Sequence, residues 1–136
     1  MIRPIKMQPL PKSRRDTPFD KLTKRMGWNL HDAIKKNKPT KFENATNYPF
    51  SDLKEHLELQ FYDDMTWENY GIYWVIDHRF PVSFFIYESY DDYEFKLCWC
   101  LDNLQPLKKI ENQKKSDTYQ AISIEDLIML YKKRQQ

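Results

Sequence analysis

The stretch "WVIDHRFP", residues 74–81, decides the fold that we expect for this chain. Its first three residues form a short apolar run typical of a buried strand, and the doublet Asp77–His78 then introduces two titratable groups. Pro81 excludes a continued central strand, so we expect a strand from Tyr73 to about Asp77 that ends at the doublet. The doublet is therefore either a structural hydrogen-bonded pair or the reactive end of a strand.

A second stretch, "DNLQPLKKIENQKK" at residues 102–115, predicts a strand followed by a helix. Residues 104–107 are expected to be extended, because the residue before Pro106 is biased away from the helical conformation. Asn103 would open this strand, and the helix after Pro106 would carry Asn112 on its first turns. Together with the strand before His78, this gives a strand–strand–helix (ββα) arrangement.

Further helices are expected at residues 19–36, 49–61, about 92–100 and from Ser123 to the C-terminal end, and those at 49–61 and after Ser123 are amphipathic. For the first of them, in an otherwise extended arm, a solvated and partly disordered leader is the alternative. Ser51 is the expected N-cap of the second helix, and Ser123 with Asp126 resembles a capping box at the last. We interpret His56 as a helix-surface histidine without function, with a phosphate contact as the alternative. The mixture of strands and helices places the chain in the α+β class.

Length and composition limit the class of protein. With 136 residues, 40% of them hydrophobic and 31% charged, the chain is expected to form one soluble globular domain. Neither an apolar run of about 18 residues nor the apolar middle of a signal peptide is found, so we expect no membrane partner. A cytoplasmic or nucleus-accessible protein is favoured over a secreted one. Cys98 and Cys100 are expected to be reduced and buried.

Charge is segregated along the chain. Residues 1–41 hold twelve Lys and Arg against three Asp and Glu, residues 42–107 hold three against thirteen, and residues 108–136 hold seven against four. The balances of +9, −10 and +3 suggest an acidic region that attracts cations, between basic regions that suit a polyanion. We therefore divide the chain into a basic N-terminal arm and helix at 1–45 and a domain at 46–136.

The runs "HLELQFYDDMTWENYG", "WVIDHRFP", "NLQPL" and "ENQKK" occur in the order in which they occur in HNH endonucleases, and the chain resembles the small phage- and virus-type members of that family. The resemblance covers residues 50–115. It implies a ββα-metal core with flanking helices. It also implies hydrolysis of DNA phosphodiester bonds to 5′-phosphate and 3′-hydroxyl ends.

Four residues take roles from this resemblance. His78 would be the general base, because an imidazole titrates near neutral pH and accepts a proton from water. Asp77 and Asn112 would provide oxygen ligands for one Mg²⁺ or Mn²⁺ ion. Asn103 would hydrogen bond to the backbone near His78 and orient its ring. Many family members have a histidine where this chain has Asn112, and this substitution moves the ligand set towards oxygen.

Basic residues on both sides of the acidic region are candidate contacts to the DNA backbone: Arg14, Arg15, Lys24, Arg25, Lys114 and Lys115. For Lys114 and Lys115 a solvated helix face is the alternative. A homodimer or a larger complex is a possible assembly. Two other functions stay open: a ββα module that binds nucleic acid without catalysis, as a subunit of a larger complex, and a protein-interaction domain whose acidic region meets a basic partner.

Overall fold

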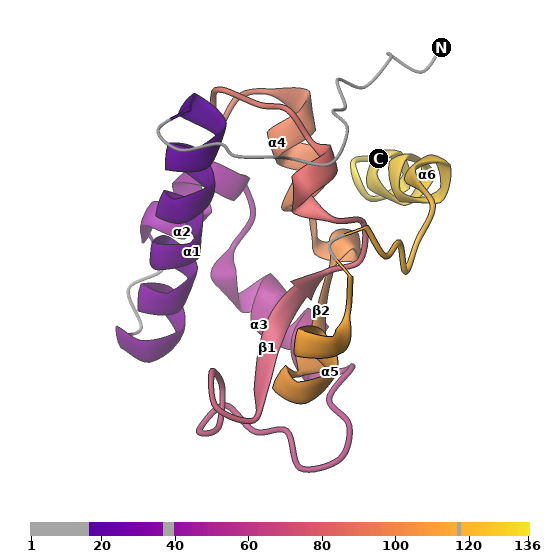
Figure 1. The fold of residues 1–136 in the computed structure, drawn as a ribbon. Helices are drawn as coiled ribbons and strands as arrows, with labels where there is room; N and C mark the ends of the chain where they lie inside the picture. Colours follow the sequence, from indigo (N-terminus) through magenta and orange to yellow (C-terminus); the bar gives the residue numbers. More distant parts are fainter. Residues whose placement is uncertain (1–16, 37–39, 117) are drawn as a thin grey trace.

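A computed structural model of the protein describes residues 17–36, 40–116 and 118–136. In chain order the α-helices and strands of these ranges are α1 (Pro18–Lys36), α2 (Thr40–Thr46), α3 (Phe50–Glu58), β1 (Trp74–His78), α4 (Tyr93–Cys98), β2 (Leu104–Lys108), α5 (Lys109–Lys114) and α6 (Ile124–Arg134). Short 3₁₀ turns, η1 (Val82–Phe84) and η2 (Leu101–Asn103), follow β1 and precede β2. Figure 1 shows α1 and α2 on one side of the strand pair and α6 on the other. The α+β class is confirmed.

The two strands form one antiparallel sheet in which Asp77 lies opposite Gln105 and His78 opposite Leu104. Gly71 starts the turn before β1 with a φ of 87°, and its N–H donates to the carbonyl of Trp74 at 2.7 Å. A two-stranded sheet alone is marginally stable in water. Here α5 packs against both strands and α3 packs against β2, so helices cover the pair.

The core of the described residues is rich in aromatic side chains. Residues 80–101 supply most of them, and the apolar stripe of α1 (Leu22, Met26, Leu30 and Ala33) joins the same cluster. Fully burying one large apolar side chain contributes about 1.5–3 kcal/mol, so this stripe binds α1 firmly to the rest of the molecule. The helix expected at residues 19–36 is confirmed with a start one residue earlier, at Pro18, where proline suits the first helical position.

The N-cap expected at Ser51 is wrong. Helix α3 begins at Phe50 with Pro49 in the N-cap position, and no side chain of the cap residue accepts a hydrogen bond. Instead the Phe50 N–H donates to the Glu43 carboxylate of α2 at 2.7 Å. A free N–H at the helix start is thus satisfied from a neighbouring helix, which local sequence rules do not reveal.

His56 has a structural contact that the sequence did not indicate. Its Nε2 lies 2.9 Å from the carbonyl oxygen of Leu104, so the ring links α3 to the first residue of β2. The helix expected at residues 92–100 is shorter, ending at Cys98, but Phe95, Cys98 and Trp99 are buried as expected. Cys98 and Cys100 are free and buried, and burial raises the pKa of the Cys100 thiol to about 12.

The capped C-terminal helix is confirmed. Ser123 is the N-cap of α6, and its hydroxyl accepts the Asp126 N–H at 3.1 Å. Arg134 at its far end donates to both carboxylate oxygens of Asp102, each at 2.9 Å, and ties α6 to η2. None of the helices in the described ranges combines the length and apolar character needed to cross a bilayer.

Candidate functional site

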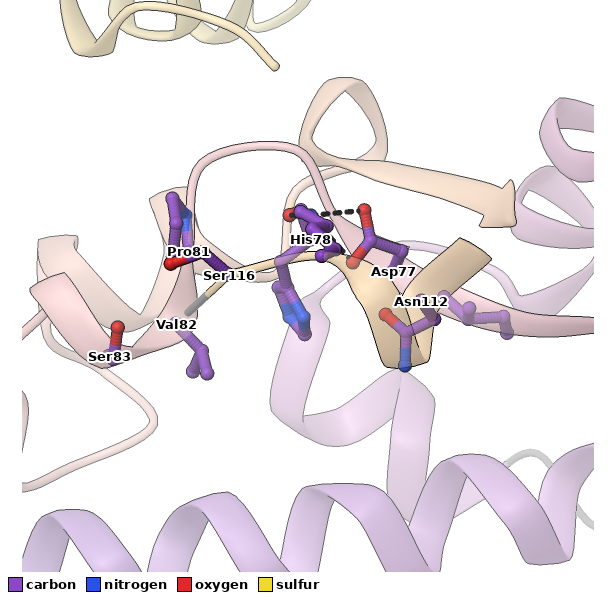
Figure 2. A pocket seen from close by; sticks show the side chains of 9 residues that line it. Asp77, His78, Pro81, Val82, Ser83, Asn112 and Ser116 are labelled. Carbon is purple, nitrogen blue, oxygen red and sulfur yellow. Dashed lines mark hydrogen bonds and ion pairs between the residues drawn. The ribbon is translucent and has the colours of Figure 1, made fainter. Parts of the chain in front are cut away.

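A cavity of about 260 Å³ opens at the end of β1. Its walls come from separate parts of the chain: Asp77 and His78 from β1, residues 81–83 from the turn after it, and Asn112 and Lys115 from α5 and its end. Figure 2 shows these side chains around one space, with Asn112 on α5 beside Asp77 and His78. The antiparallel register places α5 there, because the helix begins directly after β2.

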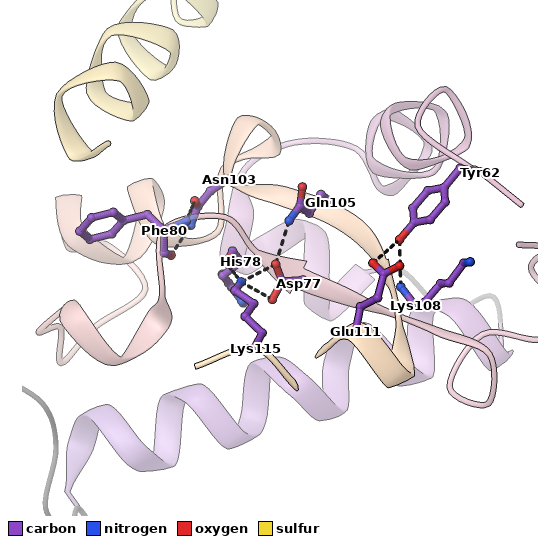
Figure 3. Close-up of polar contacts among 9 residues, drawn as sticks. All are labelled: Tyr62, Asp77, His78, Phe80, Asn103, Gln105, Lys108, Glu111 and Lys115. Atoms are coloured by element: carbon purple, nitrogen blue, oxygen red, sulfur yellow. Dashed lines mark hydrogen bonds and ion pairs between the residues drawn. The ribbon is translucent and has the colours of Figure 1, made fainter. Parts of the chain in front are cut away.

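Asp77 is a buried carboxylate, only 8% exposed, with a complete set of donors. The Lys115 ammonium donates to its two oxygens at 2.8 and 2.6 Å, and the Gln105 amide on the facing strand donates to Oδ2 at 2.9 Å (Figure 3). Burying an ionised carboxylate is costly unless it is paired and hydrogen-bonded. The carboxylate therefore depends on one cation and one amide for its place in the fold.

Lys115 lies inside the cavity rather than on a solvated helix face. Its side chain is 13% exposed, and its ammonium also donates to the His78 carbonyl at 3.0 Å. The residue is the C-cap of α5, where the backbone turns from helical to extended conformation with a ψ of 135°. The end of the helix thus directs the side chain back to the end of β1, a direction that residue spacing alone does not predict.

His78 is held in a different environment from its neighbour. Its ring lies edge-on to Trp99, with centroids 4.4 Å apart and an interplanar angle of 87°. Solvent does not reach Nε2, and this nitrogen has no hydrogen-bond partner. Burial lowers the pKa of the ring to about 4, with Lys115 acting in the same direction and Asp77 opposing it. The expectation of titration near neutral pH is wrong, because Nε2 is enclosed even though His78 as a whole is only partly buried.

Asn103 is fully buried at the centre of a hydrogen-bond network. Its side-chain oxygen accepts the Phe80 N–H at 2.7 Å, and its amide donates to the carbonyls of Phe80 at 3.2 Å and Cys98 at 2.8 Å. Its own carbonyl accepts the Arg79 N–H at 2.8 Å. Both residues directly after His78 are therefore fixed by one asparagine, which limits how far the end of β1 can bend.

Side-chain oxygens at the cavity belong to Asp77, to the partly buried Asn112 on α5, and to the hydroxyls of Ser83 and Ser116. Among the residues that the structure describes, no group of three or more His, Cys, Asp and Glu side chains is placed to hold a metal ion. Carboxylate, amide and hydroxyl oxygens are hard ligands of the kind that Mg²⁺ accepts.

The other basic candidates lie away from the cavity walls or outside the described residues. Lys114 is exposed at the end of α5. Lys24 and Arg25 are exposed on α1, and Lys24 pairs with Asp20 at 3.1 Å. Arg14 and Arg15 fall outside the described residues. Among the candidates that the structure describes, two are thus on α1 and two at the end of α5, and Lys115 is the one of these four that reaches Asp77.

Two site residues were missed by sequence reasoning. Gln105 lies opposite Asp77 in the sheet, and pairing the strands in register from the sequence would have placed it there. Trp99 contacts the His78 ring from the end of α4, and no local signal connects these positions. Gln105 could have been found from the register of the two strands, whereas Trp99 reaches His78 only through tertiary packing.

Comparisons with known proteins give relatives of viral origin. The chain is 32% identical to one uncharacterized protein of Acanthamoeba polyphaga mimivirus over 111 residues, which is 77% of this chain and 47% of the relative. It is 36% identical to a second uncharacterized protein of the same virus over 81 residues, 60% of this chain and 34% of that relative. The chain thus spans less than half the length of either relative. No family model matches the chain, and no solved structure matches it significantly.

Proposed function

We propose that this chain is a metal-dependent DNA endonuclease of the HNH type, built on a ββα-metal core. The observation that carries the proposal is that Asp77 and His78 at the end of β1 line the same cavity as Asn112 from α5. These are residues that the resemblance to HNH endonucleases selects from positions far apart in the sequence. The β1–β2–α5 order and the packing of α5 on both strands support the same reading.

The donor set fits a hard divalent cation. Asp77 already holds a cationic group, the Lys115 ammonium, on both of its oxygens, so its position favours positive charge. Asp77 and Asn112 would hold Mg²⁺ or Mn²⁺ through a carboxylate and an amide oxygen. Bound there, the ion would neutralise charge that develops on the phosphoryl oxygens and on the leaving oxygen.

His78 would take the proton of the attacking water. With a pKa of about 4 the ring is neutral at physiological pH, and its unpartnered Nε2 is an available acceptor. The water oxygen would bond to phosphorus while the bond to the 3′ oxygen breaks, and the 3′ oxygen would take up a proton from solvent, leaving a 5′-phosphate and a 3′-hydroxyl. Because solvent does not reach Nε2 in this conformation, delivery of water requires the ring or the segment after it to move.

Asn103 would position the base rather than touch substrate. It fixes the backbone of Arg79 and Phe80 through hydrogen bonds of 2.7–3.2 Å, and thereby holds the end of β1 on which the His78 ring is carried. Lys24, Arg25 and Lys114 would contact DNA phosphates from exposed positions, and such contacts weaken as salt rises. Arg14 and Arg15, which lie outside the described residues, stay candidate phosphate contacts from the sequence.

The test is a plasmid-nicking assay with the purified chain. Supercoiled DNA is incubated with Mg²⁺ or Mn²⁺, with and without EDTA, and binding is measured separately by fluorescence anisotropy. We expect EDTA-sensitive nicking that is lost in His78→Ala, while DNA affinity stays within a few-fold. Nicking at the wild-type rate by the purified His78→Ala protein would remove His78 from the mechanism.

One alternative has structural support of its own: a ββα module that binds nucleic acid without cleaving it, as a subunit of a larger complex. Solvent does not reach the Nε2 of His78, and the Lys115 ammonium neutralises Asp77. In this arrangement the cavity offers neither an accessible base nor an unpaired carboxylate. The two relatives are also about two to three times as long as the regions that match this chain. Each therefore contains further sequence that could belong to other parts of such a complex. DNA binding without EDTA-sensitive cutting would favour this alternative.

A further inference from the structure

Lys115 occupies the Asp77 carboxylate that the proposed function assigns to a metal ion. Its ammonium makes three hydrogen bonds at this place, two to Asp77 at 2.8 and 2.6 Å and one to the His78 carbonyl at 3.0 Å. The two side chains are 13% and 8% exposed, so water screens the pair poorly. A divalent cation and an ammonium would repel each other at this carboxylate.

The backbone of Lys115 is fixed by hydrogen bonds, and its ammonium has a second contact nearby. The Lys115 N–H donates to the Glu111 carbonyl at 3.0 Å and the Asn112 carbonyl at 3.2 Å, which fixes the residue at the end of α5. The ammonium lies 5.9 Å from the ring centroid of Tyr119, whose side chain is largely exposed. Rotation of the flexible lysine stem towards the aromatic face would keep a favourable environment for the charge.

We propose that Lys115 is an exchangeable internal counter-ion: it neutralises Asp77 in the metal-free protein, and a divalent cation binds by displacing its ammonium. This inference rests on the proposed function, because it takes Asp77 as the metal ligand. The exchange keeps the buried carboxylate paired in both states, which avoids an isolated buried charge. It also makes metal affinity weaker than the two oxygen donors alone would give, because every binding event must break the lysine contacts.

Lys115 would therefore set metal affinity without being a ligand. Removing its charge should strengthen binding, whereas removing a neighbouring charge that is exposed should not. Lys114 provides the matched control, because it is adjacent and exposed, and its replacement changes the net charge by the same amount. Lys115→Met removes the ammonium and keeps an unbranched side chain, while Lys115→Gln removes the charge and keeps an amide donor.

Mn²⁺ is titrated into the metal-free full chain, and binding is measured by isothermal titration calorimetry. The shift in the midpoint temperature of thermal unfolding gives a second measure of binding. We expect Lys115→Met and Lys115→Gln to bind Mn²⁺ about tenfold or more tightly than the wild type, since one positive charge leaves the site. Lys114→Met should match the wild type within about twofold, because its exposed charge is screened. Mn²⁺ should also raise the thermal midpoint of both Lys115 variants by more than that of the wild type. Asp77→Asn should abolish the binding in every background.

Two outcomes would overturn the inference, and they differ in what they leave standing. If the wild type and both Lys115 variants bind Mn²⁺ equally at a site that Asp77→Asn removes, Lys115 is not a counter-ion for that site, while the nuclease proposal stands. If none of them binds Mn²⁺ and the wild type does not nick plasmid, Asp77 is not a metal ligand and both proposals fail. The calorimetric readout does not depend on cleavage, so the two failures are distinguishable.

Discussion

Two carboxylates of this molecule are each paired with a cation, and they differ in what the pairing does. Asp102 meets Arg134 in a two-bond contact at 2.9 Å that joins η2 to the end of α6. Asp77 meets Lys115 at 2.6 Å in a cavity that also holds an unpartnered imidazole nitrogen. The planar guanidinium of Arg134 matches both oxygens of a carboxylate, whereas the ammonium of Lys115 is a compact charge at the end of a flexible stem.

The comparison separates a structural pair from a candidate reactive one. Arg134 lowers the pKa of Asp102 chiefly by hydrogen bonding to it, and the arginine is 47% exposed, so the pair is a surface tie between two elements. Asp77, in contrast, lines a cavity together with His78 and Asn112. A buried charge whose partner can leave is suited to ligand exchange. Four experiments would break or sharpen this contrast.

The largest effect is expected in cleavage. His78→Ala and Asp77→Asn should each lower the rate of plasmid nicking by about 1000-fold or more, because the proposed mechanism assigns the general base to one and the metal ligand to the other. Asp102→Asn should stay within about threefold, since it changes only the structural pair. Initial rates from gel densitometry check this. Equal losses in all three variants would mean that the two pairs do not differ in function.

The next effect concerns Asn103, which follows Asp102 in the chain and hydrogen bonds to the backbone beyond His78. Asn103→Ala leaves several buried backbone groups without partners and should lower the free energy of unfolding by about 3 kcal/mol. Asn112→Ala is the matched control and should cost less than about 1 kcal/mol, because Asn112 is only partly buried. Urea unfolding curves give both values, and similar midpoints for the two variants would contradict the bracing role.

A smaller effect is expected from pH in the metal-free protein. The His78 pKa is about 4 in the folded state and about 6.5 when unfolded, so the unfolded chain binds more protons between these values. Stability that is present above pH 6.5 is therefore lost as pH falls towards 4, by on the order of 3 kcal/mol at most. His78→Gln, which does not titrate, should lack this part of the loss. The free energies of unfolding of the wild type and of His78→Gln are measured in EDTA at pH 7 and pH 5. An equal loss of stability in the two proteins would contradict the role of His78 in the pH dependence.

The smallest effect belongs to the surface pair. Arg134→Met should lower the free energy of unfolding by about 1 kcal/mol at neutral pH, because solvent screens a half-exposed arginine. The pKa of Asp102 is lower in the folded state than in the unfolded state. The contribution of the pair is therefore complete at pH values above the unfolded-state pKa, and it is lost as pH falls through the folded-state pKa. Lys133→Met, an exposed neighbour, is the control. A loss that persists below pH 3 would show that packing of the arginine, not its charge, is what matters.

Particular residues show how far the sequence can be interpreted. The strand ending at Asp77–His78, the strand at 104–107 and the helix carrying Asn112 were predicted within one or two residues, because Pro81 and Pro106 limit the backbone locally. The Ser51 cap was wrong because Glu43, from another helix, supplies the acceptor. Neutral titration of His78 was wrong because Trp99, 21 positions away, helps to enclose the ring.

The sequence by itself determined the order of strands and helices and the α+β class. Proline positions and apolar periodicity are local properties, which is why they sufficed for this, while the resemblance to HNH endonucleases selected Asp77, His78, Asn103 and Asn112 as residues to examine together. Only the tertiary structure decided that Lys115 neutralises Asp77 and that solvent does not reach the Nε2 of His78. The physical reason is that charge pairing and solvent exclusion depend on which side chains meet in space, and residues 38 positions apart meet here through strand pairing and a helix end.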